Sequence, residues 1–146
     1  NCIDLFNSYK KNISSLLPFA KIEHIGSSAI PNAISKGDLD IYVEVKSDQF
    51  EFAIEQLKTL NFIEKQNTLR THELCMLESL NDDDVAFQIV VSGSIFTFFL
   101  AFKNKLIESP TLVNEYNQLK LQCSHLDPDQ YRTIKSDFIN RVLNHF

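Results

Sequence analysis

The sequence predicts an α/β (α+β) fold, in which a small mixed β-sheet packs with helices and a helical segment ends the chain. Two observations favour it. Segments in which apolar and polar residues alternate, as in half-buried strands, recur up to residue 91. Apolar residues at helical spacing open the chain, recur after the second of these segments, and dominate residues 94–145. No linker rich in Gly, Ser or Pro divides the chain, so we expect a single domain over 1–146.

Four segments have the length and pattern of strands. The clearest is 39–45, where Leu39, Ile41 and Val43 alternate with Asp, Tyr and Glu. Its polar residues should therefore share one face of the sheet. The polar run 81–84 predicts a hairpin turn between the last two strands. The other three strand candidates are 21–25, 75–78 and 85–91.

Helices are indicated by their start and stop residues as well as by periodicity. Residues 3–17 have an apolar face that ends at Pro18, which cannot continue a helix. A capping residue followed by proline, the preferred order at a helix start, occurs twice near the end of the chain. The start signals are Asp48 with Glu51 in capping-box spacing, Ser94 before a Phe-rich helix to about Ile107, Ser109-Pro110, and Asp127-Pro128.

The composition is that of an ordinary globular protein and argues against several functional classes. A net charge of −5 does not suit a broad surface for nucleic acid, which must be basic. Cys2, Cys75 and Cys123 form no CxxC pair and fit reduced thiols better than a disulfide framework or a zinc site. The longest apolar run, 95–102, is too short to span a bilayer, and no signal peptide is recognisable. We therefore expect a cytoplasmic protein with no membrane partner.

Two short motifs predict a site for phosphate and a cation. Gly26 permits close backbone approach, and Ser27 with the amides after it, that of Ser28 included, can form an anion-binding turn at a helix start. Asp38 and Asp40 are two apart in a predicted strand, so both carboxylates should leave one face. Two carboxylates beside a phosphate cradle suit Mg²⁺ held between the protein and a triphosphate.

Lysines near these motifs and late in the chain could complete such a site. Lys36 lies between the Gly-Ser and Asp-Leu-Asp motifs, close enough in sequence to help neutralise phosphate oxygens. Lys103, Lys120 and Lys135 have stems that can cover apolar surface, and they could also supply the basic wall that a triphosphate needs. His24, just before Gly-Ser, is equally consistent with a packed, hydrogen-bonded histidine and with a ligand-binding one.

The order Gly-Ser, a spacer of residues 28–37, then Asp-x-Asp resembles the nucleotidyltransferase superfamily of polymerase-β type. The runs HIGSSAIP at 24–31 and SKGDLDI at 35–41 look more specifically like the GrpB family, and Tyr116-x-x-Leu119-Lys120 and Tyr131-x-x-x-Lys135 extend the match. The resemblance implies a nucleotidyltransferase-like domain that transfers a nucleoside monophosphate from a nucleoside triphosphate, with Mg²⁺, to an unspecified acceptor. The site residues implied are Asp38 and Asp40 for catalysis and metal binding, and Gly26, Ser27, Ser28 and Lys36 for the nucleotide.

One departure from the pattern concerns catalysis. Active nucleotidyltransferases tend to have a third carboxylate on a later strand, and at the matching position this chain has Gln88. That carboxylate completes a two-metal site and can take the proton of the attacking hydroxyl, which glutamine does not do. Glu73, Glu78 or an aspartate of 82–84 could substitute. The alternatives left open are a non-catalytic protein of the same fold that binds a nucleotide or phosphorylated metabolite, and an interaction subunit that presents exposed Phe residues.

Overall fold

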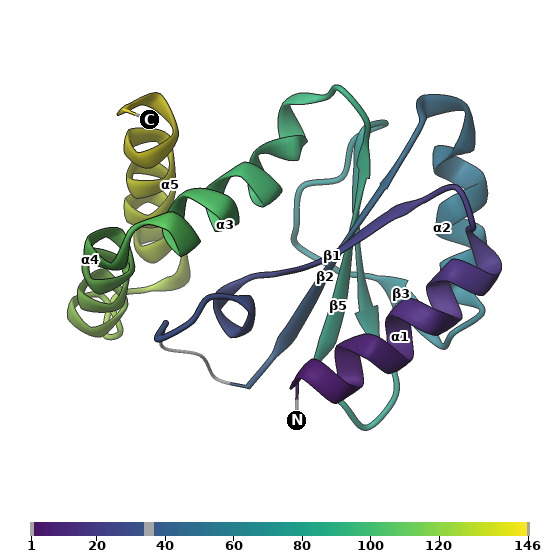
Figure 1. Ribbon diagram of the computed structural model, residues 1–146, viewed down its shortest axis with the longest axis horizontal. Helices are drawn as coiled ribbons and strands as arrows, with labels where there is room; N and C mark the ends of the chain where they lie inside the picture. The colour runs from purple at the N-terminus through teal and green to yellow at the C-terminus, as the bar shows by residue number, and fades with distance from the viewer. Residues whose placement is uncertain (1, 34–36, 146) are drawn as a thin grey trace.

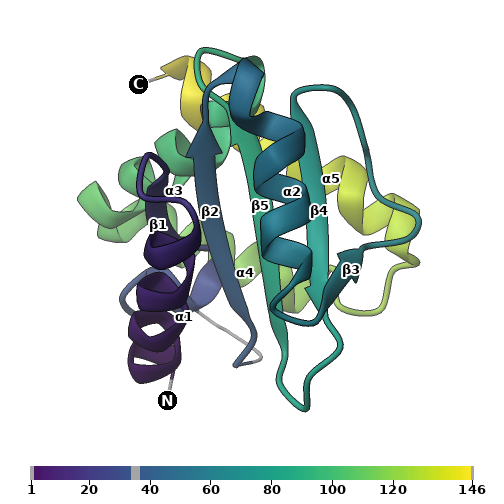
Figure 2. The ribbon, with the colours of Figure 1, turned by 90° about the vertical axis from the view of Figure 1, so that its right-hand side faces the viewer.

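The computed structural model describes residues 2–33 and 37–145, and these have the predicted mixed architecture (Figure 1). The helices and strands are α1 (Cys2–Leu16), β1 (Lys21–Ile25), β2 (Leu39–Val45), α2 (Phe50–Lys58), β3 (Phe62–Glu64), β4 (Leu74–Ser79), β5 (Val85–Val91), α3 (Phe98–Glu108), α4 (Pro110–Gln122) and α5 (Pro128–His145). The strands form one sheet, with α1 and α2 on one side and α3, α4 and α5 on the other (Figures 1 and 2). Short 3-10 turns, η1 (Ser27–Ala29), η2 (Ser47–Gln49) and η3 (Ile95–Thr97), connect several of them.

The sheet has the strand order β1-β2-β5-β4-β3. The central pair, β2 and β5, is parallel, and the other neighbouring pairs are antiparallel. Side chains that are paired in register across strands leave the same face of a sheet. One face, called the site face here, therefore carries two adjacent rows of paired residues: Asp40, Ala86 and Glu78 in the first, and Tyr42, Gln88 and Met76 in the second.

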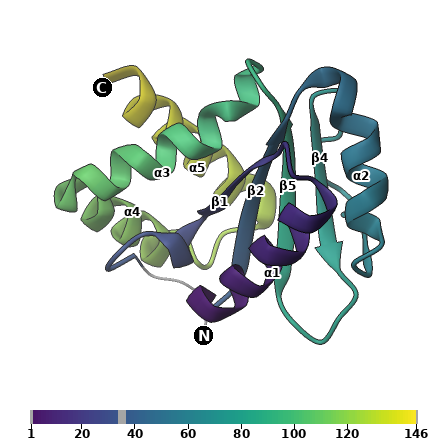
Figure 3. The ribbon, with the colours of Figure 1, turned by 45° about the vertical axis from the view of Figure 1, so that its right-hand side comes forward.

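The other face, called the core face here, is apolar and packs against α1 and α2 (Figure 3). Leu39, Ile41 and Val43 of β2 are fully buried there. Phe87 of β5 stacks on Phe62 of β3, with ring centroids 4.0 Å apart. The clear alternation in 39–45 has its cause here, because the apolar residues face these helices while Asp40 and Tyr42 face the other way.

Cover over the site face is uneven. Leu74 and Val90 lie in the row farthest from Asp40 and are buried in a cluster with Phe96 of η3 and Phe99 of α3. Residues of the first row are only half-buried. The row of Asp40, Ala86 and Glu78 therefore lies beyond the part of the site face that η3 and α3 cover with apolar side chains.

The C-terminal helices form an apolar cluster of their own. Phe102 of α3, Tyr116 of α4 and Phe138 of α5 are buried together, and the rings of Tyr116 and Phe138 stack with centroids 5.7 Å apart. Ile30, just after η1, belongs to the same cluster. This packing fixes the segment that follows Gly26-Ser27 against the C-terminal helices.

The predicted strands are confirmed within one residue at each end, and the last two helices begin as predicted. Ser109 Oγ accepts a hydrogen bond from the Leu112 amide at 3.3 Å, and Asp127 Oδ1 accepts one from the Gln130 amide at 2.9 Å. The sequence did not indicate β3, because a strand of three residues carries too little alternation to be recognised.

Two predicted helix starts are wrong in detail. Asp48 lies inside η2, and the capping contact is made instead by Gln49, whose Oε1 accepts from the Lys46 amide at 3.1 Å. Ser94 precedes η3 rather than α3, which begins at Phe98, and it makes no side-chain capping bond. In both places a 3-10 turn intervenes before the α-helix. Among the described residues no helix has the combination of length and apolar character that crossing a membrane requires.

Candidate phosphate and cation site

Gly26 lies so close to the Asp40 side chain that no residue with a Cβ would fit at position 26. Ile25 pairs with Asp40 across β1 and β2, so Gly26 follows directly beside the carboxylate. A Cβ on Gly26 would lie 2.5 Å from Asp40 Oδ2, and its φ of 78° is in the left-handed region that favours glycine. The two sequence motifs therefore meet at one end of the sheet.

Ser27 contacts a lysine from the C-terminal helices. Lys120 Nζ of α4 donates a hydrogen bond to Ser27 Oγ and lies 4.4 Å from the ring centroid of Tyr116. Burial lowers the pKa of Lys120, and the charge of Lys135 adds to this, while Tyr116 and Asp38 act in the opposite direction. Lys120 thus contacts the Gly-Ser turn and also interacts electrostatically with Asp38.

The helix start predicted at Ser27 is confirmed, but as a short 3-10 turn and not as an α-helix. Only the 3-10 turn η1 forms, and the Ala29 and Ile30 amides donate inside it, to Gly26 O and Ser27 O at 3.1 and 3.2 Å. Pro31 follows directly and disfavours a helical continuation. Lys120 places a positive charge beside Ser27.

Asp40 is the most strongly perturbed acid of the site face. Burial first, then the charge of Asp38 and to a smaller extent that of Asp84, together raise the pKa of Asp40 from 3.8 to about 6. Lys135 of α5 and Lys65, just after β3, act against this increase. Charges from four separate segments are therefore felt at one carboxylate, which is the electrostatic condition expected at a ligand site.

Asp38 lies one residue before β2 begins at Leu39, so it is not inside the strand as predicted. It is half-buried and still shares the end of β2 with Asp40. Leu39 pairs with Val85, and its amide donates to Asp84 O at 2.9 Å, so Asp38 is level with Asp84 across the parallel pair. Both acids of the Asp-x-Asp motif remain at the same sheet end.

The predicted lysines divide into two groups. Lys120 and Lys135 act on the carboxylates, as described above. Lys103 lies instead beside β1, with Nζ 4.0 Å from Glu23 Oε2. Lys36 lies outside the described residues. The sequence did not indicate that Lys65 acts on Asp40. Lys65 follows β3, a strand that was not predicted, and the pairing of β3 with β4 places that strand in the sheet.

His24 and Ser28 interact with each other. His24 Nε2 and Ser28 Oγ are hydrogen-bonded at 2.8 Å, and the imidazole stacks on Phe6 of α1 with centroids 5.2 Å apart. Burial and then the charge of Lys103 lower the pKa of His24. His24 is therefore a packed histidine that is hydrogen-bonded to Ser28 of the turn.

No three His, Cys, Asp or Glu side chains in the described ranges gather closely enough to hold a metal ion. Of the proposed substitutes for a third carboxylate, Glu73 lies near the far end of β5, where its carbonyl accepts from the Val91 amide. Asp83 Oδ2 accepts from Tyr9 of α1 at 2.6 Å. Glu78 shares a row with Asp40 but is separated from it by Ala86, and Asp84 acts on Asp40 from the turn.

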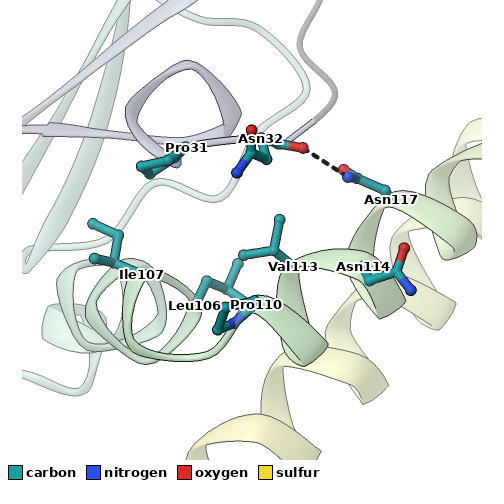
Figure 4. Close-up of a pocket in the computed structure, with 8 residues that line it drawn as sticks. All are labelled: Pro31, Asn32, Leu106, Ile107, Pro110, Val113, Asn114 and Asn117. Atoms are coloured by element: carbon teal, nitrogen blue, oxygen red, sulfur yellow. Dashed lines mark hydrogen bonds between the residues drawn. The ribbon is translucent and has the colours of Figure 1, made fainter.

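Two hollows lined by described residues lie away from the acid pair. One, of about 330 Å³, lies between the segment after η1 and the junction of α3 and α4, where Asn117 Nδ2 donates to Asn32 O at 2.9 Å (Figure 4). The other, of about 360 Å³, lies between α4 and α5 and includes Cys123. The first hollow is lined by apolar side chains and carboxamides, and Asn117 is one helical turn from Lys120.

The family model described as "GrpB protein" matches residues 3–145. The chain belongs to the GrpB family. A UPF0157 protein of Vibrio cholerae is 53% identical over 143 residues, which are 98% of this chain and 76% of that protein. The solved structure of the conserved protein GrpB from Enterococcus faecalis superposes with a TM-score of 0.78 at 22% identity, covering 98% of this chain and 90% of that one.

The GrpB fold is also similar to that of nucleotidyltransferases. A structure of the Cid1 poly(U) polymerase bound to MgATP matches with a TM-score of 0.55 at 14% identity, covering 84% of this chain and 40% of that one. At this identity the likeness concerns the fold. The nucleotidyltransferase-like fold expected from the Gly-Ser and Asp-x-Asp motifs is therefore confirmed.

Proposed function

We propose that this GrpB protein binds a nucleoside triphosphate with Mg²⁺ at the Gly26, Ser27, Asp38 and Asp40 end of the sheet and transfers its nucleoside monophosphate to an acceptor. The observation that carries the proposal is the contact of Gly26 with the Asp40 carboxylate next to the Ser27–Lys120 bond. It brings carboxylates and a lysine together at the place where the two motifs meet. The MgATP complex of the structurally similar polymerase supports the choice of ligand.

The donor set suits a hard divalent cation. Carboxylate oxygens are the ligands that Mg²⁺ prefers, usually one or two of them together with phosphate oxygens and water. The pKa of Asp40 is raised partly by the nearby charge of Asp38, a repulsion that a bound cation would relieve. When bound, Mg²⁺ would neutralise charge on the phosphates during displacement of pyrophosphate.

The remaining groups position the substrate. Lys120 and Ser27 would bind phosphate oxygens, because a lysine donates several hydrogen bonds to such oxygens and Ser27 presents a hydroxyl beside it. Lys65 and Lys135 would balance the charge that the triphosphate brings to Asp38 and Asp40. Catalysis would then rest on holding the α-phosphate in line with the acceptor and on compensating its charge.

A second candidate is a protein that binds the same ligand without turnover. It is favoured by Gln88, which takes no proton from an acceptor, and by the absence of a three-acid group among the described residues. Both candidates predict nucleotide binding that depends on the cation, and they differ in pyrophosphate release.

A thermal-shift titration with ATP, CTP, GTP and UTP, each with and without Mg²⁺, tests binding. We expect at least one nucleotide to raise the melting temperature by ~2 °C or more with Mg²⁺, because a ligand stabilises the state it binds. The shift should disappear in Asp38→Asn and Asp40→Asn. No shift with any nucleotide and cation contradicts both candidates. Pyrophosphate release in the presence of an acceptor-containing cell extract supports transfer, and its absence despite binding supports the second candidate.

A further inference from the structure

Gln88 has a buried oxygen with an unused hydrogen-bonding capacity. Its Oε1 is out of contact with solvent and accepts no hydrogen bond from the described part of the chain. A buried carbonyl oxygen left in this state is unfavourable, and in native structures it is often paired with a bound water or ion. Gln88 is therefore a position at which a bound species would be stabilised.

Gln88 lies on the site face, close to the acid pair. It pairs with Tyr42 of β2, and its neighbour on the same face, Ala86, pairs with Asp40. In a β-sheet such a diagonal neighbour is about 8 Å away between Cα atoms. Ala86 is too small to separate the two side chains, so a carboxamide and a carboxylate at these positions can approach the same ion.

The two cross-strand neighbours of Gln88, Met76 and Tyr42, donate no hydrogen bond to its oxygen. Met76 pairs with it from β4 and has no hydrogen-bond donor in its side chain. On the other side, the Tyr42 hydroxyl donates to Glu44 Oε1 at 2.5 Å and is thereby directed away. Neither the Met76 thioether nor the Tyr42 hydroxyl thus donates to Gln88 Oε1, so this oxygen is available to a ligand.

We propose that Gln88 Oε1 is a third protein ligand of the divalent cation, joining Asp38 and Asp40; this rests on the proposed function, which places the cation at that pair. Carboxamide oxygens are ordinary ligands of Mg²⁺ and Ca²⁺. Gln88 thus supplies coordination where nucleotidyltransferases tend to have a carboxylate, without its negative charge and without a group that accepts a proton. The protein ligands then carry two negative charges instead of three.

The test measures the binding of Mn²⁺ by isothermal titration calorimetry, in the presence of a non-hydrolysable ATP analogue. Gln88→Met keeps the length of the side chain and removes the oxygen, so we expect Mn²⁺ to bind about tenfold more weakly. Gln88→Glu should bind it more tightly than the wild type. The control is Gln56→Met, a half-buried glutamine of α2 on the other side of the sheet, which should leave Mn²⁺ affinity within twofold. Melting temperatures without metal show whether each variant is folded.

The outcomes separate this inference from the proposed function. The charge added by Gln88→Glu attracts a cation whether or not residue 88 is a ligand. The Mn²⁺ affinity of Gln88→Met relative to the wild type therefore decides. If Gln88→Met binds Mn²⁺ as the wild type does, while Asp40→Asn does not bind it, the inference is wrong and the proposed function stands. Loss of affinity in Asp84→Asn but not in Gln88→Met assigns the third ligand to Asp84 and also overturns the inference. A wild type that binds no Mn²⁺ with the nucleotide contradicts the proposed function itself.

Discussion

The two faces of the sheet differ at the end where Asp40 lies. On the core face, β2 and β5 present fully buried apolar residues to α1 and α2, among them Ile41 and Phe87. On the site face, the same strands present Asp40, Tyr42 and Gln88. Strand alternation thus separates the apolar core from the candidate site: neighbouring residues belong to different faces and should respond differently to substitution.

The largest effect should come from the core face. Phe87→Ala removes a ring that stacks on Phe62, and we expect a loss of ~4 kcal/mol in the free energy of unfolding, as for large-to-small changes in a packed core. Urea unfolding monitored by circular dichroism measures it. Gln88→Met, one residue along on the site face, should cost no more than ~1 kcal/mol. Equal losses at 87 and 88 would show that the faces do not divide the roles in this way.

Gly26→Ala should disrupt the site more than the fold. The added Cβ would displace the Asp40 carboxylate, so we expect Mg²⁺-dependent nucleotide affinity to fall by ~100-fold, equivalent to ~2.7 kcal/mol. Calorimetric titration measures it. Gly93→Ala is the matched control, because Gly93 has a similar φ of 80° but no atoms within 4 Å of an added Cβ. Equal losses of affinity in the two variants would assign the effect to backbone strain instead of to the carboxylate.

Asp40 should make stability depend on pH. Its pKa is raised in the folded state, from 3.8 to about 6, so folding favours the protonated form. The stability associated with that form is fully present below the unfolded pKa and is lost as pH rises through about 6. Without metal, Asp40→Asn should therefore equal the wild type near pH 3 and exceed it by ~2–3 kcal/mol at pH 7.5. Urea unfolding at the two pH values tests this, and a difference independent of pH would contradict it.

The smallest of these effects is expected at Lys120. Lys120→Met removes a donor to Ser27 and one positive charge near Asp38, and we expect nucleotide affinity to fall about tenfold, or ~1.4 kcal/mol. Lys11→Met, at an exposed position of α1, makes the same change in net charge and should leave affinity within twofold. If both variants weaken binding equally, the attraction is a property of overall charge.

Much of this division could be predicted from the sequence. The alternation in 39–45 indicated both faces of β2, because one of them is completely covered by helices. The spacing of Gly26-Ser27 and Asp38-x-Asp40 predicted that the two motifs lie close together, and the antiparallel pairing of β1 with β2 brings them to one end of the sheet. Spacing along the chain is sufficient here because a single connection joins the two strands.

The parts that could not be predicted depend on contacts distant in sequence. Lys65 reaches the site through β3, whose three residues show no recognisable pattern. The bond from Lys120 to Ser27 depends on how α4 packs against Ile30 and its neighbours, which no local signal specifies. The short form of the turn at Ser27 has, by contrast, a local cause, because Pro31 follows soon after it and disfavours a helical continuation.

A crystal structure with Mn²⁺ and a non-hydrolysable nucleoside triphosphate tests the central claim most directly, because the anomalous signal of manganese locates the cation. The proposed function predicts Mn²⁺ bound by the carboxylates of Asp38 and Asp40 at about 2.1–2.2 Å, with a phosphate oxygen against Ser27 and Lys120. Manganese elsewhere, or a nucleotide confined to the hollow between Asn32 and Asn117, would contradict it.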